Sequence, residues 1–568
     1  MSSLDETVPW QERATKKRQE CANKIPHEWK LSEQFLAEFK APLSENKNNL
    51  IRAQAIRKSG ILTEQELKIT EEYTVTSLIS ALADGSLTSA EVTLAYSKRA
   101  ALAQQLVSCL TETMFDQAQG RAQYLDNLRA QGKLAGPLHG LPVSIKDNFN
   151  YKGEESTIGM VAFLDEKATS NSPLVDILLE LGAVIYVKTN VPQTMMLIIF
   201  VLVRPLIPTT MSSIELLIRG TRHWGLVDLA AARALSLLYE DLRLELELIS
   251  EASSVRIPAH CCGIYGFRPS AARVPNGGMR VCTTSGMKFI LSCAGPLSSD
   301  LNGIETFFES VFNAQPARLD STIIDVPWRK VPTKSTLRIG VMPESSVFPL
   351  HPPIRRVLAE AVQLLKAQGH QIIHLDEKDC RILECNEVGW AMFNLDQGAK
   401  KRIESSGEPP VPAMHYIGKQ AAKLLGFYKS SLPDTSSLDQ LHKLALLNTR
   451  RSELREAYRK LWVHHDLDIC IAPPAQTTAV PHDTFGVAPY TTLTNVLDYP
   501  SCILPFGKVG EADAKESFAL NDNQLGAEYN YEQLEGAPCS VQLFTTTMRD
   551  EECLQIAKQI DEILRRNE

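Results

Sequence analysis

Short apolar runs alternate with helix-length segments along most of the chain, and this alternation limits the possible folds more than any other feature. Residues 143–145 and 183–187 are apolar runs of strand length, and the segment 172–182 has helical spacing and ends in glycine. Strands that alternate with helices of about 10–15 residues are typical of α/β proteins, in which helices cover a largely buried sheet. The same order of strand, helix and strand is expected at 337–341, 353–368 and 371–375. The sequence therefore predicts an α/β fold.

The amino-terminal part of the chain differs in charge content and in the spacing of its apolar residues. Residues 1–75 are rich in charge, and their apolar residues recur at helical spacing, which predicts a helical extension. The sequence has no internal repeat and no low-complexity linker, so we expect one large domain over residues 76–568. A composition of 44% hydrophobic and 22% charged residues fits a folded chain rather than a disordered one.

Charge and cysteine usage narrow the functional classes. The net charge of −8 argues against a nucleic-acid partner, and the 12 cysteines lack the C-x-x-C spacing, as reduced intracellular thiols do. The most apolar run, residues 195–203, is shorter than the ~18 residues of a membrane span. Residues 1–18 lack the apolar core of a signal peptide. We therefore expect a soluble cytoplasmic protein without a membrane partner.

Two histidine-containing clusters suggest metal sites at first sight. In His260-Cys261-Cys262, three adjacent side chains cannot all face one ion, and no second pair stands at ligand spacing. Buried thiols beside a turn are the favoured interpretation. His464-His465-Asp466 follows a charged helix, which favours a solvated surface. No metal and no organic cofactor is expected.

Lys146 is a stronger candidate for chemistry. It directly follows the apolar strand at 143–145 and precedes Asp147, so it is expected at the end of a buried strand. Burial favours the neutral form of an amine, and a neutral amine can act as a base for a hydroxyl nucleophile. A structural salt bridge with Asp147 explains the same spacing, and the spacing alone does not choose between the two.

Several motifs resemble those of the amidase signature family. The first is Gly-Leu-Pro-Val-Ser-Ile-Lys-Asp-Asn at 140–148, and the second is Lys-Thr-Asn-Val-Pro-Gln-Thr-Met at 188–195. Further matches follow in family order at 254–259, 263–269, 294–297, 473–474 and 536–538. They extend from about residue 75 to residue 565, and so many ordered matches are specific. The amino-terminal extension and the second motif are most similar to fungal acetamidases and general amidases.

This resemblance implies an amidase-signature α/β/α sandwich with a central mixed β-sheet, plus the N-terminal helical extension. It also implies a Ser–cis-Ser–Lys triad that hydrolyses amides through an acyl-enzyme. Lys146 takes the position of the base and Ser254 that of the nucleophile, with Ser253 as the second choice. Met195 matches a position that lines the substrate site. Glu251, Ala252 and Ser253 fall in the turn whose backbone N–H groups hold the oxyanion.

The chain departs from the family pattern between Met195 and Ser254. The family has a glycine-rich loop with the relay cis-serine about 24 residues before the nucleophile, whereas Leu229 and Ala230 stand there in this chain. The family also has Gly-Thr-Asp-Ile-Gly-Gly before the nucleophile, and here Glu251 and Ala252 replace glycines. The written sequence therefore lacks the relay serine, which is expected near Leu229, and the oxyanion turn.

A shift of reading frame accounts for this departure. If the third base of each codon is read with the first two of the next, residues 227–235 can encode Gly-Ser-Gly-Gly-Gly-Glu-Gly-Ala. In the same way, residues 239–252 can encode Arg-Gly-Ser-Pro-Leu-Gly-Val-Gly-Thr-Asp-Ile-Gly-Gly, and 204–211 can encode Thr-Leu-Asn-Pro-His-Asn-Asn. We hypothesise that roughly residues 200–253 are an out-of-frame translation. The alternative is a divergent loop, in which residues 224–238 form a helix and 242–248 a strand.

The resemblance predicts an amidase that converts a small, acetamide-like monocarboxylic acid amide into the carboxylate and ammonia. The first alternative is a catalytically impaired homologue of the same fold. The second is an amidotransferase-type subunit that passes ammonia to a partner. The only expected partner is a small-molecule amide, and the sequence leaves the oligomeric state open, with a homodimer as one option.

Overall fold

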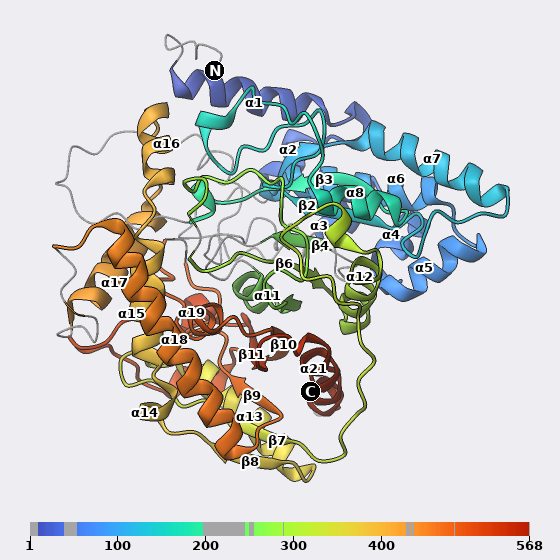
Figure 1. Ribbon diagram of the computed structural model, residues 1–568. Helices are drawn as coiled ribbons and strands as arrows, with labels where there is room; N and C mark the ends of the chain where they lie inside the picture. Colours follow the sequence, from blue (N-terminus) through green and yellow to red (C-terminus); the bar gives the residue numbers. More distant parts are fainter. Residues whose placement is uncertain are drawn as a thin grey trace.

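A single mixed β-sheet forms the centre of the molecule (Figure 1). The computed structural model describes residues 9–38, 54–196, 245–248, 255–287, 289–427, 433, 437–481 and 483–566. Within them the sheet has eleven strands. In spatial order they are β1 (Leu110–Thr113), β3 (Val184–Thr189), β2 (Pro142–Lys146), β4 (Glu245–Leu248), β6 (Ala294–Ser298), β5 (Tyr265–Arg268), β10 (Ser501–Lys508), β11 (Pro538–Phe544), β9 (Ile469–Ala472), β7 (Arg338–Val341) and β8 (Gln371–His374).

The strand directions divide the sheet into regions. Strands β3, β2 and β4 run parallel to one another, as do β8, β7 and β9. The strands between them, together with β1 at the edge, pair in antiparallel fashion. Parallel strands need crossover connections on the faces of the sheet. The two strand–helix–strand patterns of the sequence are these crossovers: α8 (Pro173–Glu180) precedes β3, and α13 (Pro352–Ala367) joins β7 to β8.

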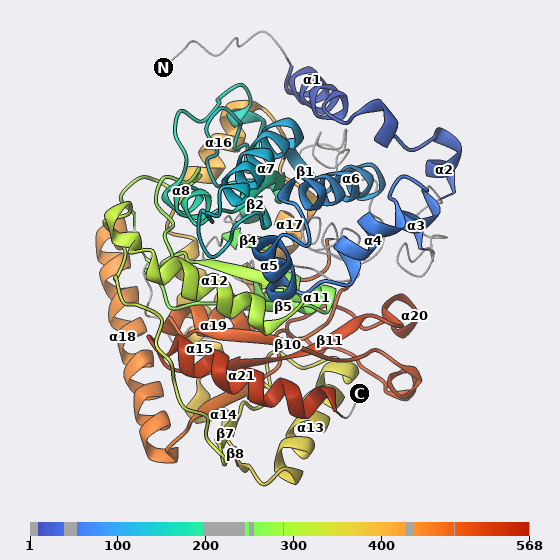
Figure 2. The same cartoon turned by 90° about the vertical axis from the view of Figure 1, so that its right-hand side faces the viewer.

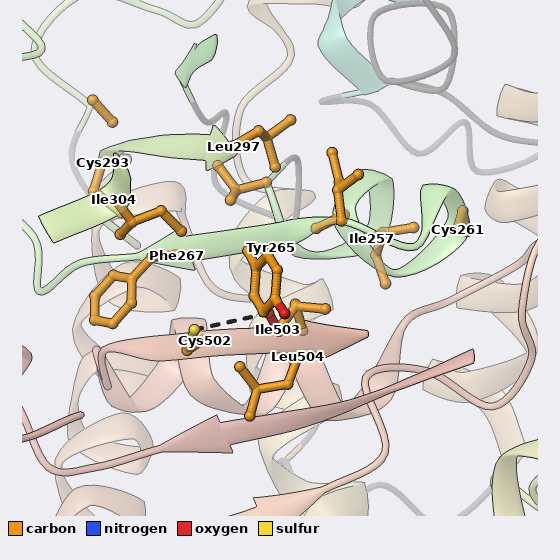
Figure 3. Packing of buried hydrophobic residues seen from close by; sticks show 14 of the residues in the cluster. Ile257, Cys261, Tyr265, Phe267, Cys293, Leu297, Ile304, Cys502, Ile503 and Leu504 are labelled. Carbon is orange, nitrogen blue, oxygen red and sulfur yellow. Dashed lines mark hydrogen bonds between the residues drawn. The ribbon is translucent and has the colours of Figure 1, made fainter. Parts of the chain in front are cut away.

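Helices lie on both faces of the sheet (Figures 1 and 2). The strand β5 shows the reason: Tyr265 and Phe267 contact α21 and α12 on one face, whereas Gly266 lies against Ala259 of α11 on the other. Figure 3 shows α11 beside β5 and β10. The remaining helices are α1 (Trp10–Asn23), η1 (His27–Trp29), α2 (Glu33–Ala37), α3 (Ala55–Lys58), α4 (Glu64–Glu71), α5 (Val75–Asp84), α6 (Ser89–Val107), α7 (Phe115–Ala130), η2 (Val161–Phe163), η3 (Gln193–Met196), α11 (Arg256–Cys262), α12 (Leu301–Asn313), η4 (Pro316–Arg318), α14 (Glu377–Cys380), α15 (Ile382–Phe393), α16 (Gly398–Ser406), α17 (Pro412–Phe427), α18 (Gln440–His465), α19 (Pro489–Leu497), η5 (Glu511–Lys515), α20 (Tyr531–Leu534) and α21 (Asp550–Arg565).

Helix α1 is fastened to the edge of the sheet by buried charge. The Lys17 amine lies 2.5 Å from Glu112 Oε1 and 3.2 Å from Glu155 Oε2. The Lys24 amine lies 2.7 Å from Glu112 Oε2 and 3.2 Å from Glu154 Oε2. Glu112 stands in β1 and is 1% exposed, so Lys17 of α1 and Lys24, directly after α1, supply its counter-charge.

The predicted fold class is confirmed, since helices sandwich a large mixed sheet. The strand expected at 143–145 is part of β2, and that expected at 183–187 is part of β3. The division at residue 75 remains a prediction. None of the helices in the described residues combines the length and apolar character that a membrane span requires.

Candidate active site

Three parallel strands end side by side, and these ends carry the candidate residues. Lys146 is the last residue of β2 and is fully buried. Met195, 4% exposed, lies in η3 shortly after β3. Strand β4, on the other side of β2, ends at Leu248, and the chain leads from there toward Ser254. The carboxyl ends of parallel strands are the common place for ligand sites in α/β folds.

The remaining predicted site residues lie outside the described residues. These are the nucleophile candidates Ser254 and Ser253, the turn residues Glu251 and Ala252, and the expected relay position near Leu229 and Ala230. Their roles stay predictions. Val255 is the next described residue along the chain. It is fully buried and directly precedes α11.

Arg256 anchors the start of α11. Its guanidinium is fully buried and donates to Asn495 Oδ1 at 2.5 Å, to Ser501 Oγ at 3.2 Å and to Thr494 Oγ1. These acceptors are neutral, so burial lowers the pKa of Arg256. The bonds tie the residue two positions after Ser254 to α19 and β10, which fixes where the candidate nucleophile segment enters α11.

Asp147 is held by other groups than the sequence suggested. Its Oδ1 lies 3.7 Å from the Lys188 amine and accepts the Thr111 hydroxyl at 2.6 Å, and its Oδ2 accepts the backbone N–H of Ile158 at 2.6 Å. The salt bridge considered between Lys146 and Asp147 is therefore a bridge between Lys188 and Asp147. It forms because β2 and β3 pair in parallel, which brings Lys188 level with Ile145.

Lys188 is a second buried lysine at this edge of the sheet. Its amine donates to Ser156 Oγ at 2.7 Å and to the carbonyl of Glu155. Burial lowers the pKa of Lys188, while the nearby Asp147 and Glu112 carboxylates act in the opposite direction. Burial would raise the pKa of Glu112, but Lys17 and Lys24 hold it below its usual value. A balanced set of buried charges thus stands next to Lys146.

Met195 belongs to an apolar cluster that is separate from the main core. The cluster joins the loop before η2, the η3 segment, and the helices α16 and α17. Its buried members are Ile158, Met160, Phe163, Val191, Met195, Cys282, Ala399, Ile403 and Met414. The backbone of Thr194 and Met195 has φ of 62° and 53°, which L side chains adopt at a cost. The substrate-lining role of Met195 stays a prediction.

The two histidine clusters have ordinary structural surroundings. His260 is fully buried, its Nε2 lies 2.9 Å from the carbonyl oxygen of Thr477, and burial lowers its pKa to about 4. His464 and Asp466 are exposed at the end of α18, as the sequence predicted. Within the described part of the chain, no group of three or more His, Cys, Asp or Glu side chains is arranged to hold a metal ion.

Sequence reasoning gave no role to Lys188, Arg256, Gln193 or Glu408, although the first three stand inside the quoted motifs. The available signal was a polar side chain within an apolar run, as for Lys188 in β3. Glu408 had no such signal, because it stands between two helices in a polar stretch.

Comparison with known proteins identifies the class. The family model "Amidase" matches residues 91–200 and 252–554. The chain therefore belongs to the amidase family, and it is an amide hydrolase with the amidase-signature fold. The interval without a match, residues 201–251, lies within the segment of the reading-frame hypothesis.

The similar proteins are fungal enzymes and structurally characterised amidases. The chain is 31% identical to an amidase of Gibberella moniliformis over 565 residues, 98% of this chain and 99% of that protein. It is 32% identical to an acetamidase of Aspergillus oryzae over 588 residues, 98% and 99% of the two chains. The structure of a fatty acid amide hydrolase has a TM-score of 0.79 at 25% identity and covers 98% of this chain and 95% of its own.

Proposed function

We propose that this protein hydrolyses a small monocarboxylic acid amide to the carboxylate and ammonia through an acyl-enzyme on Ser254. Lys146 at the end of β2 supports this proposal most directly: it is a fully buried amine beside the strand that leads toward the nucleophile segment. The similarity to an acetamidase of Aspergillus oryzae supports a short acyl group.

The proposed reaction moves one proton around a closed path. The Lys146 amine takes a proton from a relay serine, which takes the proton of the Ser254 hydroxyl as its oxygen attacks the amide carbonyl. The proton then passes to the amide nitrogen, so that ammonia leaves and an ester to Ser254 remains. Water attacks this ester by the same path, and the carboxylate is released. Each step conserves atoms and charge without a metal or an organic cofactor.

The relay serine of this mechanism is absent from the written sequence. The proposal therefore applies to the chain in which residues 200–253 carry the alternate-frame sequence, called here the alternate-frame chain. For the chain as written, we propose the catalytically impaired form, because Glu251 places a carboxylate in the turn that must stabilise an oxyanion.

The test is ammonia release by the alternate-frame chain from acetamide, benzamide and a long-chain amide. We expect turnover of acetamide above that of the long-chain amide. A protein that releases no ammonia from any of the three contradicts the proposed activity. Co-purification with a second subunit or with tRNA would support ammonia transfer to a partner instead.

A further inference from the structure

The junction between α16 and α17, residues 407–411, is bound to the Met195 segment by one side chain. Gln193 stands two residues before Met195 and is 1% exposed. Its Nε2 donates to the carbonyl of Pro409 at 3.1 Å, and its Oε1 accepts the backbone N–H of Val411 at 3.0 Å. A single amide group thus makes two hydrogen bonds to the backbone of the junction, and both must break before the junction can move away.

Glu408 makes the second connection of the same junction. It is 4% exposed, and its Oε1 accepts the backbone N–H of Val161 at 3.1 Å and the Ser406 hydroxyl at 3.2 Å. Within the described residues, Glu408 Oε2 is buried without a hydrogen-bond partner.

Glu408 is bonded to Val161, and three arginines that contact Phe163 or Leu164 nearby are each engaged by another group. Arg13 of α1 donates to the carbonyl of Leu164 at 3.2 Å and lies 3.5 Å from Asp165. Arg402 of α16 and Arg280 lie over the ring of Phe163, at 5.2 Å and 4.7 Å from its centroid. In the described part of the chain, Glu408 has no cation within ion-pair distance, and burial raises its pKa to about 7.

The junction connects two helices that both contribute to the apolar cluster of Met195. Ala399 and Ile403 of α16, and Met414 of α17, pack in the same apolar cluster as Met195. The other side of η3 is fixed, because Thr194 N–H donates to Ile158 O at 3.1 Å, and a Cβ at Gly159 would lie 2.6 Å from the carbonyl oxygen of Pro192. The α16–α17 side of the cluster is held to η3 by the bonds of Gln193 to residues 409 and 411.

We propose that Gln193 and Glu408 form a proton-sensitive latch that holds the α16–α17 junction against the Met195 segment and so regulates access to the acyl side of the site. When the Glu408 carboxyl is neutral, it can stay buried at little cost. When it is ionised, it is a buried charge without a cation, and this favours conformations in which the junction separates and water reaches the carboxylate. The latch holds more tightly at lower pH. The assignment of the Met195 segment to the acyl side of the site rests on the proposed function.

Hydrogen exchange measures the latch without any need for activity. The backbone N–H groups of Val161 and Val411 exchange when the junction opens. If the carboxyl pKa is about 7 when closed and near its usual 4.5 when open, linkage favours opening about tenfold more at pH 8 than at pH 6. We therefore expect these two amides to lose about tenfold in protection over that interval, after correction for the intrinsic exchange rate.

Three variants of the full chain make this test specific. Glu408→Gln keeps the shape but cannot ionise, so its protection should not change with pH after the same correction. Glu404→Gln on the exposed face of α16 is the matched control and should behave as the unmodified chain does. Gln193→Leu removes both backbone bonds and should lower the protection of Val411 at every pH. The same pH dependence in Glu408→Gln as in the unmodified chain would overturn the latch.

Activity of the alternate-frame chain tests the consequence for the site. The ratio of kcat/KM for hexanamide to that for acetamide should rise with pH and stay constant in Glu408→Gln. If amide protection falls with pH as expected but the protein hydrolyses no amide, the proposed function is wrong and the latch is still supported. If the ratio rises equally in both proteins, the latch does not regulate access.

Discussion

At the scale of single residues, the two buried lysines of the site have different surroundings. Lys188 is bound to Asp147, Ser156 and the Glu155 carbonyl, which makes it part of the framework. Lys146 ends the neighbouring strand, which lies beside the strand that leads toward the nucleophile segment. Asp147 is engaged by Lys188 and by Thr111, and Lys146 is the base in the proposed mechanism.

Removal of the Lys146 amine should therefore abolish activity without abolishing the fold. In the alternate-frame chain, Lys146→Ala should lower kcat/KM for acetamide by several orders of magnitude, because the relay serine loses its proton acceptor. Circular dichroism should show a retained secondary structure. Lys188→Ala is the informative comparison: it should reduce stability, because it leaves Asp147 buried without a cation. Unchanged turnover in Lys146→Ala would contradict the assigned role.

The nucleophile can be identified by a covalent probe. A fluorophosphonate should label the alternate-frame chain at Ser254, which directly precedes the buried Val255 and the anchored Arg256. Peptide mass spectrometry locates the label. Ser254→Ala should abolish labelling, and Ser253→Ala should retain it. If labelling survives in Ser254→Ala, the nucleophile is another serine, with Ser253 as the next candidate.

The sequence predicted those site residues that stand out in their local sequence pattern, but not the contacts that depend on strand pairing. Lys146 stood out because it follows an apolar strand, and the structure places it at a buried strand end. The Asp147–Lys188 bridge could not be predicted, since it depends on the parallel pairing of β2 with β3. The bonds of Gln193 to residues 409 and 411 join positions more than two hundred residues apart, and only the tertiary fold brings them together.

At the scale of elements, the ion pairs of Lys17 and Lys24 with Glu112 hold α1 against the edge of the sheet. We call these three residues the clasp. Replacement of both Lys17 and Lys24 by Met should destabilise the protein by roughly 3–5 kcal/mol, because Glu112 would remain buried without its cations. Urea unfolding measures this loss. Lys16→Met on the exposed side of α1 is the control and should change stability by no more than about 0.5 kcal/mol.

The pH dependence of the clasp has a definite sign. Since Lys17 and Lys24 hold the pKa of Glu112 below its usual 4.5, the clasp stabilises the fold above that pH and loses its effect as the pH falls through the lowered value. The stability difference between the unmodified chain and the double variant should therefore shrink in acid. Adding Glu112→Gln to the double variant should restore part of the lost stability at neutral pH. A difference that is constant down to strongly acidic pH would contradict this explanation.

At the scale of the whole molecule, periodicity predicted the class of fold but not the order of the strands. The strand–helix–strand units around β2 and β3 and around β7 and β8 were visible in the sequence, because their apolar runs and helices are local features. The sheet order, in which β6, β5, β10 and β11 lie between the two parallel regions, depends on pairings such as Ser501 with Arg268 and Phe544 with Cys470. These pairings connect segments far apart in the chain.

Strand β4 falls within the segment that the reading-frame hypothesis and the divergent-loop alternative interpret differently. The divergent-loop alternative expects a strand at 242–248, and β4 is present at Glu245–Leu248. Strand β4 lies between β2 and β6 in the sheet. The alternate frame provides Leu-Gly-Val-Gly-Thr at about the same place, which is a strand without charge. The hypothesis remains a prediction, and sequencing of the gene and its transcript over this stretch tests it directly.

The last prediction compares the two versions of the chain. The chain as written should release almost no ammonia from acetamide, whereas the alternate-frame chain should be active. The written chain lacks the relay serine, and it has Glu251 and Ala252 in the oxyanion turn, where the loss of one donor alone typically costs ~10²–10³ in rate. Its folded core should persist, because the buried residues of β2, β3, β5, β10 and β11 lie outside residues 200–253. Ammonia release measures the difference, and urea unfolding of both proteins verifies that each is folded. Equal activity in two folded proteins would mean that neither the relay serine nor the glycine turn is needed where the family pattern places them.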